Sequence, residues 1–418
     1  MAHGNTKLAV LPTIIKILPP PLPFCGRFRS FTWFKMITIS RSPCNVILYS
    51  LLVTLQCLLI YSFLSSKRDA TLKIKEETSL RIIEGAAHTN FTRPIPFSEF
   101  PPKPEGYHYS RVLVAARTQY ENIDWMAHEL PDLPTAIYVV DKPREGDLTV
   151  PVNKGHEAMV YLTYIIDHYD SLPDVVFFFH SQRFAWHNNP LLNGDSVETI
   201  KRMNLDRVSR FGYMNSRCQL DPGCPDWIHL DRPYFDVQNI KKSGELAFTT
   251  QVWRELWPGH KPPTALSQPC CAQFAASRDR ILETPKEQYI HLRKWLMETE
   301  LADYNSGRVF EYLWQYIFMR ESQYCPAEHS CYCDGYGVCF GSAEDYRQFW
   351  YVRREREYLE KKIRGMTMIQ FKGDAATIEE TEHQILQLRT EEQRQLQEAR
   401  KRGEDPNQRI LETERREG

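Results

Sequence analysis

A run of five apolar residues that leads directly into polar side chains constrains the fold of this chain more than any other stretch. The run is 175–179, and it is followed by His180, Ser181, Gln182 and Arg183. A short, fully apolar run bounded by turn residues is typical of a buried central strand in a parallel sheet. Ligands of open α/β sheets bind outside the carboxyl ends of such strands. We therefore predict a functional site at the end of this strand; the alternative is that its polar residues only mark a sheet edge and a turn.

Strand and helix patterns alternate along the chain on both sides of this run. Helices are expected where apolar residues recur at spacings of three and four, and strands where short apolar runs are bounded by polar residues. The expected strands are 111–116, 136–140 and 270–276, and the expected helices are 156–168, 285–299 and 306–319. The alternation predicts an α/β domain over 109–345, with a mostly parallel sheet and flanking helices.

Residues 46–64 carry no charge and predict one transmembrane helix, because a span needs ~20 apolar residues. A cleaved signal peptide is the alternative, although its apolar core is usually shorter and nearer the start. Lys and Arg are about equally common on the two sides, so the positive-inside rule does not choose the orientation. The predicted divisions are a basic Pro-rich cytoplasmic tail at 1–45, the span, a stem at 65–108, the domain, and a charged helical or disordered tail at 346–418.

Cysteines and a glycosylation triplet favour a lumenal domain. Asn90 begins an Asn-Phe-Thr acceptor triplet. An even number of cysteines in close groups is typical of disulfides in an oxidising compartment. The eight that follow the apolar stretch are Cys218, Cys224, Cys270, Cys271, Cys325, Cys331, Cys333 and Cys339. We expect a single-pass type II membrane glycoprotein of the endoplasmic reticulum or Golgi.

Two groups of these cysteines suggest local pairing. Cys218 and Cys224 are close enough in sequence to close a small loop, and the cysteines of 325–339 are expected to form two disulfides in a compact segment of loops. A zinc site with His329 is the alternative for the second group. Its spacing lacks the paired Cys-x-x-Cys of usual structural zinc sites.

Charge gives little indication of partners. The formal net charge is -1, so nothing in the total favours nucleic acid. The tail at 375–418 is rich in Glu, Gln and Arg, and its heptad spacing is not sustained. A solvated single helix that frays into disorder is expected there rather than a coiled coil.

The order of motifs resembles a family of fungal membrane proteins catalogued as a domain of unknown function. The matching stretches fall between Arg111 and Cys339, and cover nearly the whole folded part. They are VLVAARTQYENIDWM, IYVVDK, VNKGHEAMVYLTYIIDHYD, VVFFFHSQRFAWHNN, CCAQFAASRDRI and SGRVFEYLWQYIF. This resemblance implies membership of a family but no established reaction.

A more distant resemblance is to glycosyltransferases of the GT-A type, whose fold is Rossmann-related. In these enzymes the loop after a first strand takes the nucleotide, a second strand ends in an acidic residue near the base or ribose, and an Asn-x-Gly helix start follows. A later strand carries the Asp-x-Asp that holds metal and diphosphate. Residues 117–122, Asp141, 153–155 and 180–182 fall in the corresponding order, and Glu311 lies in the late helix where such enzymes carry a catalytic carboxylate. The chain departs from the pattern by lacking Asp-x-Asp at that strand end, which argues against ordinary Mn²⁺-dependent transfer.

This resemblance implies transfer of a sugar from a nucleotide-sugar donor, with a divalent metal as the candidate cofactor. Such transfer needs a neutralised diphosphate and a deprotonated acceptor hydroxyl. The candidate catalytic groups are Glu311 as general base and His180 as base or metal ligand. The candidate donor- and substrate-binding residues are Arg117, Glu121, Asp141, Asn153, Lys154, Gly155, Gln182, Arg183 and His187, of which His187 is also a candidate metal ligand.

Each of these assignments has a structural alternative. The cations can be solvated surface groups, a His at a strand end is often a hydrogen-bonded core residue, and Asp141 can cap a turn. Arg308 and Glu311 lie at a spacing that allows an ion pair on an exposed helix face. Trp186 is a candidate stacking ring, although tryptophan is more often a core residue.

Two other function classes stay open. A metal-dependent hydrolase could use His180, His187 and Asp141, since three such ligands with one open position suit zinc hydrolysis. An inactive lumenal scaffold or binding protein would instead expose the tryptophans of the loop-rich region. These are Trp186, Trp227, Trp253 and Trp257.

Overall fold

A computed structural model describes residues 54–64, 98–230, 248–368 and 375–414 of the chain. The chain divides into two units, Met1–Asp69 and Ala70–Gly418, each of which is described by itself. Residues 54–64 are helical, and the first part of the expected span, like Asn90, lies outside the described residues. Within the described ranges, no helix combines the length and the apolar character needed to cross a membrane.

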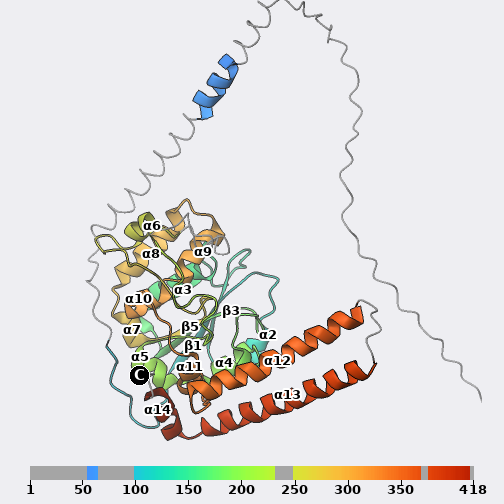
Figure 1. The fold of residues 1–418 in the computed structure, drawn as a ribbon. Helices are drawn as coiled ribbons and strands as arrows, with labels where there is room; N and C mark the ends of the chain where they lie inside the picture. Colours follow the sequence, from blue (N-terminus) through green and yellow to red (C-terminus); the bar gives the residue numbers. More distant parts are fainter. Residues whose placement is uncertain (1–53, 65–97, 231–247, 369–374, 415–418) are drawn as a thin grey trace, which may run out of the picture. The chain divides into compact units, whose positions relative to one another are not determined.

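A five-stranded sheet forms the centre of the larger unit (Figure 1). Its strands are β1 (Arg111–Arg117), β2 (Thr135–Val139), β3 (Val175–His180), β4 (Tyr213–Asn215) and β5 (Phe274–Ser277), in the order β2-β1-β3-β5-β4. β2, β1 and β3 are parallel, whereas β5 runs antiparallel to both β3 and β4. The predicted mixed α/β fold is confirmed. The strand expected at 270–276 begins only at Phe274.

Helices cover both faces of the sheet. Alternate residues of β1 point to opposite sides: Val112 and Val114 join one core, and Leu113 and Ala115 join the other. The helices are α2 (Asp124–Glu129), α3 (Glu157–Asp167), α4 (Ser196–Arg202), α5 (Leu205–Phe211), α6 (Thr250–Leu256), α7 (Arg278–Leu282), α8 (Lys286–Glu298), α9 (Asp303–Glu311), α10 (Trp314–Met319), α11 (Glu328–Tyr336), α12 (Ala343–Met368), α13 (Ala375–Arg402) and α14 (Pro406–Glu414). α3, α8, α9 and α10 contribute to the first core, and α2, α4, α5 and α11 to the second.

The helix expected at 306–319 is two helices. Its apolar stripe is buried as predicted, but α9 ends at Glu311 and α10 begins at Trp314. At this break the backbone carbonyls accept hydrogen bonds from side-chain amides. Gln268 donates to the carbonyl of Glu311, and Gln315 donates to the carbonyl of Tyr312. A distant glutamine therefore contributes to ending α9, which helical periodicity alone does not indicate.

The cysteines form four disulfides, two of which join distant parts of the chain. The long-range bridges are Cys218–Cys331 and Cys224–Cys325, and the short-range ones are Cys270–Cys271 and Cys333–Cys339. The expected small loop between Cys218 and Cys224 is therefore wrong. The two disulfides expected within 325–339 are wrong as well, because only Cys333–Cys339 forms there, and the segment contains α11 rather than loops alone. With all four of its sulfurs in disulfides, that segment has no thiolate left for zinc.

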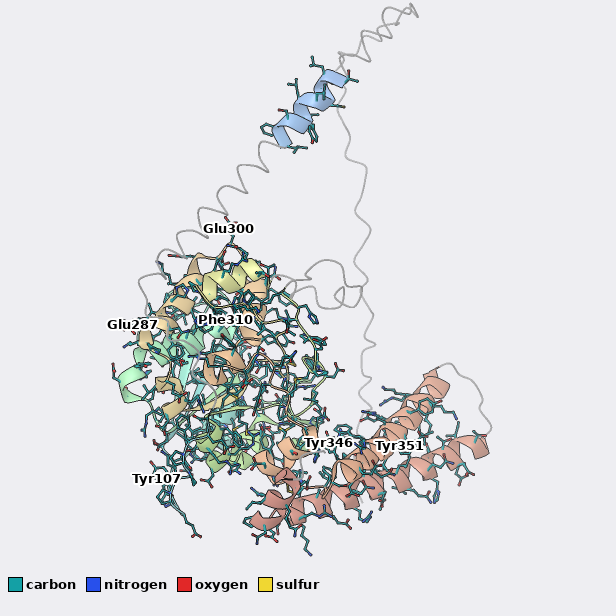
Figure 2. All side chains as sticks on the ribbon, turned by 60° about the vertical axis from the view of Figure 1, so that its left-hand side comes forward. Tyr107, Glu287, Glu300, Phe310, Tyr346 and Tyr351 are labelled. Carbon is teal, nitrogen blue, oxygen red and sulfur yellow. A yellow bond between two sulfur atoms is a disulfide. The ribbon has the colours of Figure 1, made fainter. Side chains whose placement is uncertain are left out.

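The charged end of the chain packs back on the domain instead of forming a solvated single helix. α12 and α13 lie side by side (Figures 1 and 2), and Arg356 of α12 donates to Glu392 of α13 at 2.6 Å. Arg400 donates to Glu198 of α4 at 3.0 Å. Glu412 of α14 accepts from the backbone amides of Phe340 and Gly341. These contacts attach the pair α12 and α13 to the domain near the start of α12, where Tyr346 is buried. Tyr351, farther along α12, is exposed (Figure 2).

Candidate functional site

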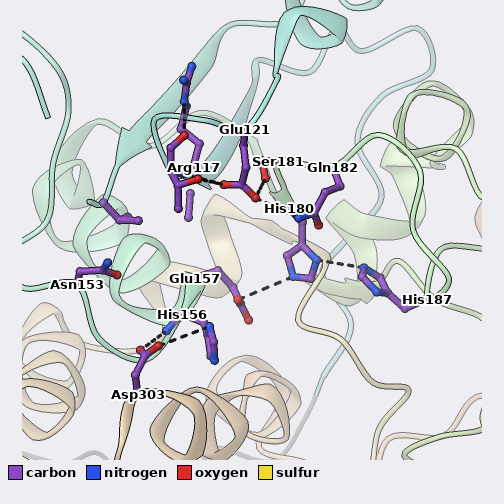
Figure 3. Close-up of a pocket in the computed structure, with 13 residues that line it drawn as sticks. Arg117, Glu121, Asn153, His156, Glu157, His180, Ser181, Gln182, His187 and Asp303 are labelled. Carbon is purple, nitrogen blue, oxygen red and sulfur yellow. Dashed lines mark hydrogen bonds and ion pairs between the residues drawn. The ribbon is translucent and has the colours of Figure 1, made fainter. Parts of the chain in front are cut away.

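A pocket of about 440 Å³ opens at the carboxyl ends of β1 and β3 (Figure 3). The chain leaves β1 to form β2 on one side and later returns to form β3 on the other side. This reversal creates the switch point at which open α/β sheets bind ligands. The lining residues come from the ends of β1 and β3, from the loops that follow β1, β2 and β3, and from the starts of α3 and α9. They are Ala116, Arg117, Thr118, Glu121, Val140, Asn153, His156, Glu157, His180, Ser181, Gln182, His187 and Asp303.

The loop after β1 is tied to the loop after β3 by one carboxylate. Glu121 accepts from the backbone amide of Thr118 at 2.6 Å, from the Ser181 hydroxyl at 2.8 Å and from the Gln182 amide at 3.1 Å. Arg117 donates to two carbonyls of its own loop, at 3.0 and 2.9 Å. Glu121 therefore has a positioning role, and the guanidinium of Arg117, a lining residue, is held against its own loop.

Two histidines of the pocket lining lie next to each other, within hydrogen-bonding distance. His180 Nδ1 lies 3.1 Å from His187 Nε2, and His180 Nε2 lies 3.9 Å from an Glu157 carboxylate oxygen (Figure 3). Burial lowers the pKa of His180 to about 3 and that of His187 to about 4, and the charge of Arg217 acts in the same direction on His187. Both rings are thus neutral at pH 7. The backbone of His180 is held by its amide, which donates to Gln273 at 3.1 Å.

Glu157 is the first residue of α3 and lies between the histidine pair and α9. Burial raises its pKa to about 8, and the negative charge of Glu311 acts in the same direction. The turn before it needs left-handed backbone, with φ of 76° at Gly155 and 51° at His156. Sequence analysis missed this residue; the available signal was an acidic residue at the start of the helix after Asn-Lys-Gly.

The expected anion site at the start of α3 is occupied by a carboxylate of the chain itself. Asp303 accepts from the backbone amides of Gly155 at 2.6 Å and His156 at 3.2 Å. Lys154 turns away and donates to the carbonyl of Thr299. The phosphate-binding roles expected of Lys154 and Gly155 are therefore not supported by their geometry. Asp303 lies about 150 positions from its partners, so no local pattern could have indicated it.

Two other expected ligand-binding residues are engaged elsewhere. Arg183 pairs with Asp195 at 3.0 Å and Glu129 at 2.9 Å, which fixes the loop after β3 but uses its guanidinium. Asp141 accepts from the amide of Gln119 at 2.9 Å and so caps a turn. Neither residue lines the pocket.

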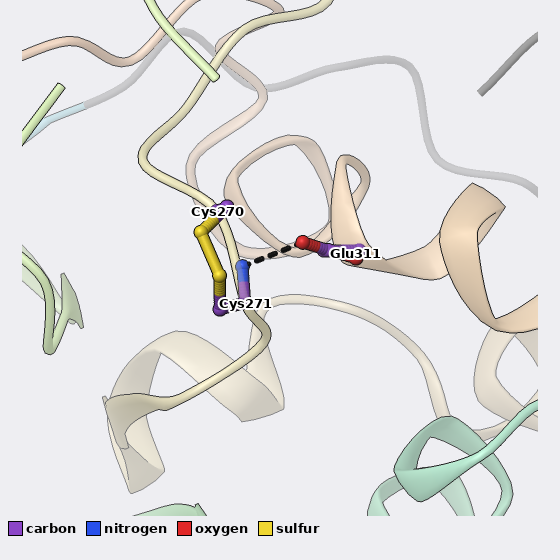
Figure 4. Close-up of side chains that lie close together, drawn as sticks. All are labelled: Cys270, Cys271 and Glu311. Carbon is purple, nitrogen blue, oxygen red and sulfur yellow. Dashed lines mark hydrogen bonds between the residues drawn. A yellow bond between two sulfur atoms is a disulfide. The ribbon is translucent and has the colours of Figure 1, made fainter. Parts of the chain in front are cut away.

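Glu311 is not placed to act as the general base of this pocket. It is buried beside the bridge between adjacent cysteines, where it accepts from the backbone amide of Cys271 at 2.7 Å (Figure 4). Its other oxygen pairs with Arg308. The ion pair weighed from the spacing is present, in a buried rather than exposed place, and Glu311 is a structural residue that holds the segment leading into β5.

The structure thus gathers six of the expected residues in one pocket: Arg117, Glu121, Asn153, His180, Gln182 and His187. Of the tryptophans expected to be exposed, Trp253 and Trp257 are fully buried, whereas Trp186 is 75% exposed. Trp186 precedes His187 and packs against its ring. One large aromatic ring therefore lies beside a pocket that is lined mainly by polar residue types.

The chain was compared with protein families, curated proteins and solved structures. A family model described as a protein of unknown function (DUF3431) matches residues 113–334, which is more than half of the chain and includes every residue that lines the pocket. No curated protein and no solved structure matches the chain.

Proposed function

Because this chain belongs to the DUF3431 family of proteins of unknown function, we propose a function from its site: transfer of a sugar from a nucleotide sugar to an acceptor hydroxyl in the pocket at the ends of β1 and β3. The observation that carries the proposal is the meeting of Arg117, the histidine pair and Glu157 at the switch point of the sheet. A volume of about 440 Å³ is within the ~300–1,000 Å³ of small-molecule sites.

The donor would lie with its diphosphate near the ends of β1 and β3. Arg117 supplies the permanent positive charge among the lining residues, and charge-assisted hydrogen bonds from a guanidinium suit phosphate oxygens. Asn153 and Gln182 add neutral amide groups that can bind ribose or sugar hydroxyls. Because the pocket wall also carries the carboxylates of Glu121 and Asp303, a diphosphate needs a further positive charge there.

Glu157 replaces Glu311 as the general base in this proposal. Its carboxylate lines the pocket and, in the part of the chain that the structure describes, lies beside His180 rather than in an ion pair with Lys or Arg. It would take the proton of the acceptor hydroxyl as that oxygen attacks the anomeric carbon of the donor. The bond from the anomeric carbon to the diphosphate oxygen breaks, and its electron pair leaves with the nucleoside diphosphate.

A metal-dependent hydrolase is the second candidate, favoured by the distance of 3.1 Å between the two histidine nitrogens. Water would then replace the acceptor hydroxyl, and no nucleotide would be required. Binding by nucleoside diphosphates separates the two functions.

The membrane and compartment assignments are part of the same proposal. The uncharged stretch at 46–64 supports a type II anchor, and four disulfides support a lumenal domain of the endoplasmic reticulum or Golgi.

The test is the melting temperature of the purified full-length chain with a panel of nucleoside diphosphates and nucleotide sugars, with and without Mn²⁺. A ligand at a hundred times its Kd adds ~2.7 kcal/mol to the stability of the native state. We expect a shift with one nucleotide that is lost in Arg117→Ala and retained in Arg144→Ala, whose side chain is exposed and lies outside the pocket lining. A shift with zinc and with no nucleotide would support the hydrolase instead.

A further inference from the structure

We propose that His180 and His187 bind one divalent metal ion, through His180 Nδ1 and His187 Nε2, with Glu157 as the hydrogen-bond partner of the other nitrogen of His180. The ion belongs to the class that favours imidazole ligands, with Zn²⁺ preferred over Mg²⁺. This inference deepens the proposed function, because the ion supplies the positive charge that a diphosphate needs in the pocket.

The separation of the two nitrogens fits a shared ion. Two imidazole nitrogens at ~2.0–2.1 Å from a tetrahedral Zn²⁺ lie ~3.3 Å from each other. In the structure the two atoms are 3.1 Å apart, and the rings are nearly perpendicular, with an interplanar angle of 81°. The ion would replace the hydrogen bond that the two ring nitrogens make at this distance, and the rings would turn so that both lone pairs point at the ion.

The surroundings of His180 set which of its nitrogens is a ligand. Among the described residues, its buried Nε2 has no hydrogen-bond partner, and the group it faces is the Glu157 carboxylate at 3.9 Å. Nδ1 is the nitrogen that faces His187, so it is the ligand atom; the neutral ring then carries its proton on Nε2, which faces the Glu157 oxygen. A carboxylate on the outer nitrogen of a metal-binding histidine is a recurrent arrangement that orients the ring and raises its basicity.

The backbone holds both ligands in place from different elements. The amide of His180 donates to Gln273 at the start of β5, at 3.1 Å. The carbonyl of His187 accepts from Arg217 at 2.7 Å. Preorganisation of this kind lowers the entropic cost of metal binding.

The site is open. In the part of the chain that the structure describes, no third His, Cys, Asp or Glu has a ligand atom close enough to form a three-residue set with this pair. The groups of three that are close enough contain Cys270 with Cys271, or Cys333 with Cys339, and these sulfurs are in disulfides. Two positions are thus left for water or for phosphate oxygens, as in a metal that bridges protein and donor.

The test is titration of the purified full-length chain with Zn²⁺ alone, followed by calorimetry, with Co²⁺ as a spectroscopic probe of nitrogen coordination. We expect Zn²⁺ affinity to fall at least tenfold in His180→Ala and in His187→Ala, and to be unchanged in His383→Ala, an exposed histidine of α13. Glu157→Gln should weaken binding by roughly 10–100-fold, as loss of such a partner does. Melting curves without metal show whether each variant is folded.

Equal Zn²⁺ affinity in the wild type and in the variant with both histidines replaced would overturn the inference, and so would absence of Zn²⁺ binding by the wild type. No nucleotide is present in this experiment, so its outcome is independent of the proposed transfer. Histidine-dependent Zn²⁺ binding together with no response to nucleotides would keep the metal site and overturn the transferase.

Discussion

The two long-range disulfides are nested, and their contributions to stability are therefore expected to depend on each other. The Cys218–Cys331 bridge encloses the Cys224–Cys325 bridge in the sequence. Cys218 and Cys224 are six positions apart, and so are Cys325 and Cys331. Breaking the inner bridge while the outer one is intact releases a ring of roughly 14 residues, which costs about 3 kcal/mol in the chain-entropy account. Breaking it when the outer bridge is already absent releases a loop of about 100 residues, at a cost of about 4.7 kcal/mol.

The variants are Cys224→Ala/Cys325→Ala in the wild-type chain and in a Cys218→Ala/Cys331→Ala background. The inner cysteines are only partly buried, so replacing their sulfurs leaves little cavity. Urea titration gives the free energy of unfolding of each variant, and circular dichroism first confirms that each is folded. We expect the inner bridge to contribute about 1.7 kcal/mol more in the absence of the outer one, the difference between the two loop terms.

Equal costs in the two backgrounds would refute this reasoning, because they would show that the bridges constrain the unfolded chain independently. A larger cost with the outer bridge intact would do the same. Either result would mean that the bridges stabilise the native state through local contacts rather than through the unfolded chain.

Three further perturbations test other parts of the structure. Gly155→Ala should destabilise the domain by ~1–2 kcal/mol, because the backbone at this position has a positive φ. Overpacking should add ~1–3 kcal/mol, because a Cβ would lie 2.5 Å from Leu296. Thermal melts measure the loss, and Gly146→Ala is the control, since Gly146 also has a positive φ but an added Cβ there has nothing within 4 Å. Glu412→Ala should lower the free energy of unfolding by ~1–3 kcal/mol in urea titrations, because it leaves the amides of Phe340 and Gly341 without their acceptor. An unchanged unfolding midpoint would show that this contact of α14 does not stabilise the domain. Partial burial alone would raise the pKa of Asp174, but hydrogen bonds from Ser110 and the charge of Arg278 lower it below the usual value. Asp174 should therefore contribute stability at pH 7 that is lost as the pH falls from about 4 through its native pKa. The loss of unfolding free energy caused by Asp174→Asn should accordingly be smaller at pH 3 than at pH 7. An equal loss at both pH values would contradict the assignment.

The sequence predicted the elements that depend on local pattern. The apolar run at 175–179 and the helix that follows Gly155 lie where hydrophobic spacing placed them, whereas α4, α5, β4 and α6 lie in the stretch expected to be loop-rich. The placement of Arg117 and His180 in one pocket was also predictable, because the carboxyl ends of neighbouring parallel strands lie at the same edge of a sheet.

What could not be predicted depends on partners distant in sequence. Lys154 and Gly155 were expected to bind phosphate, but Thr299 and Asp303 occupy their hydrogen-bonding groups. The cysteine pairing was missed for the same reason, since spacing alone does not choose among partners. Glu311 had the expected residue type and helix but not the expected surroundings, because α9 turns that carboxylate toward Cys271.

The central claim, glycosyl transfer with Glu157 as base, is tested most directly by the release of nucleoside diphosphate from a panel of nucleotide sugars. The full-length wild-type chain is compared with Glu157→Gln, and water serves as a slow acceptor where none is known. With Zn²⁺ at a concentration that saturates both proteins, we predict release from one donor, with kcat at least ~10²-fold lower in Glu157→Gln and the melting shift caused by the nucleoside diphosphate retained. Release from no nucleotide sugar, or equal rates in the two proteins, would contradict the account.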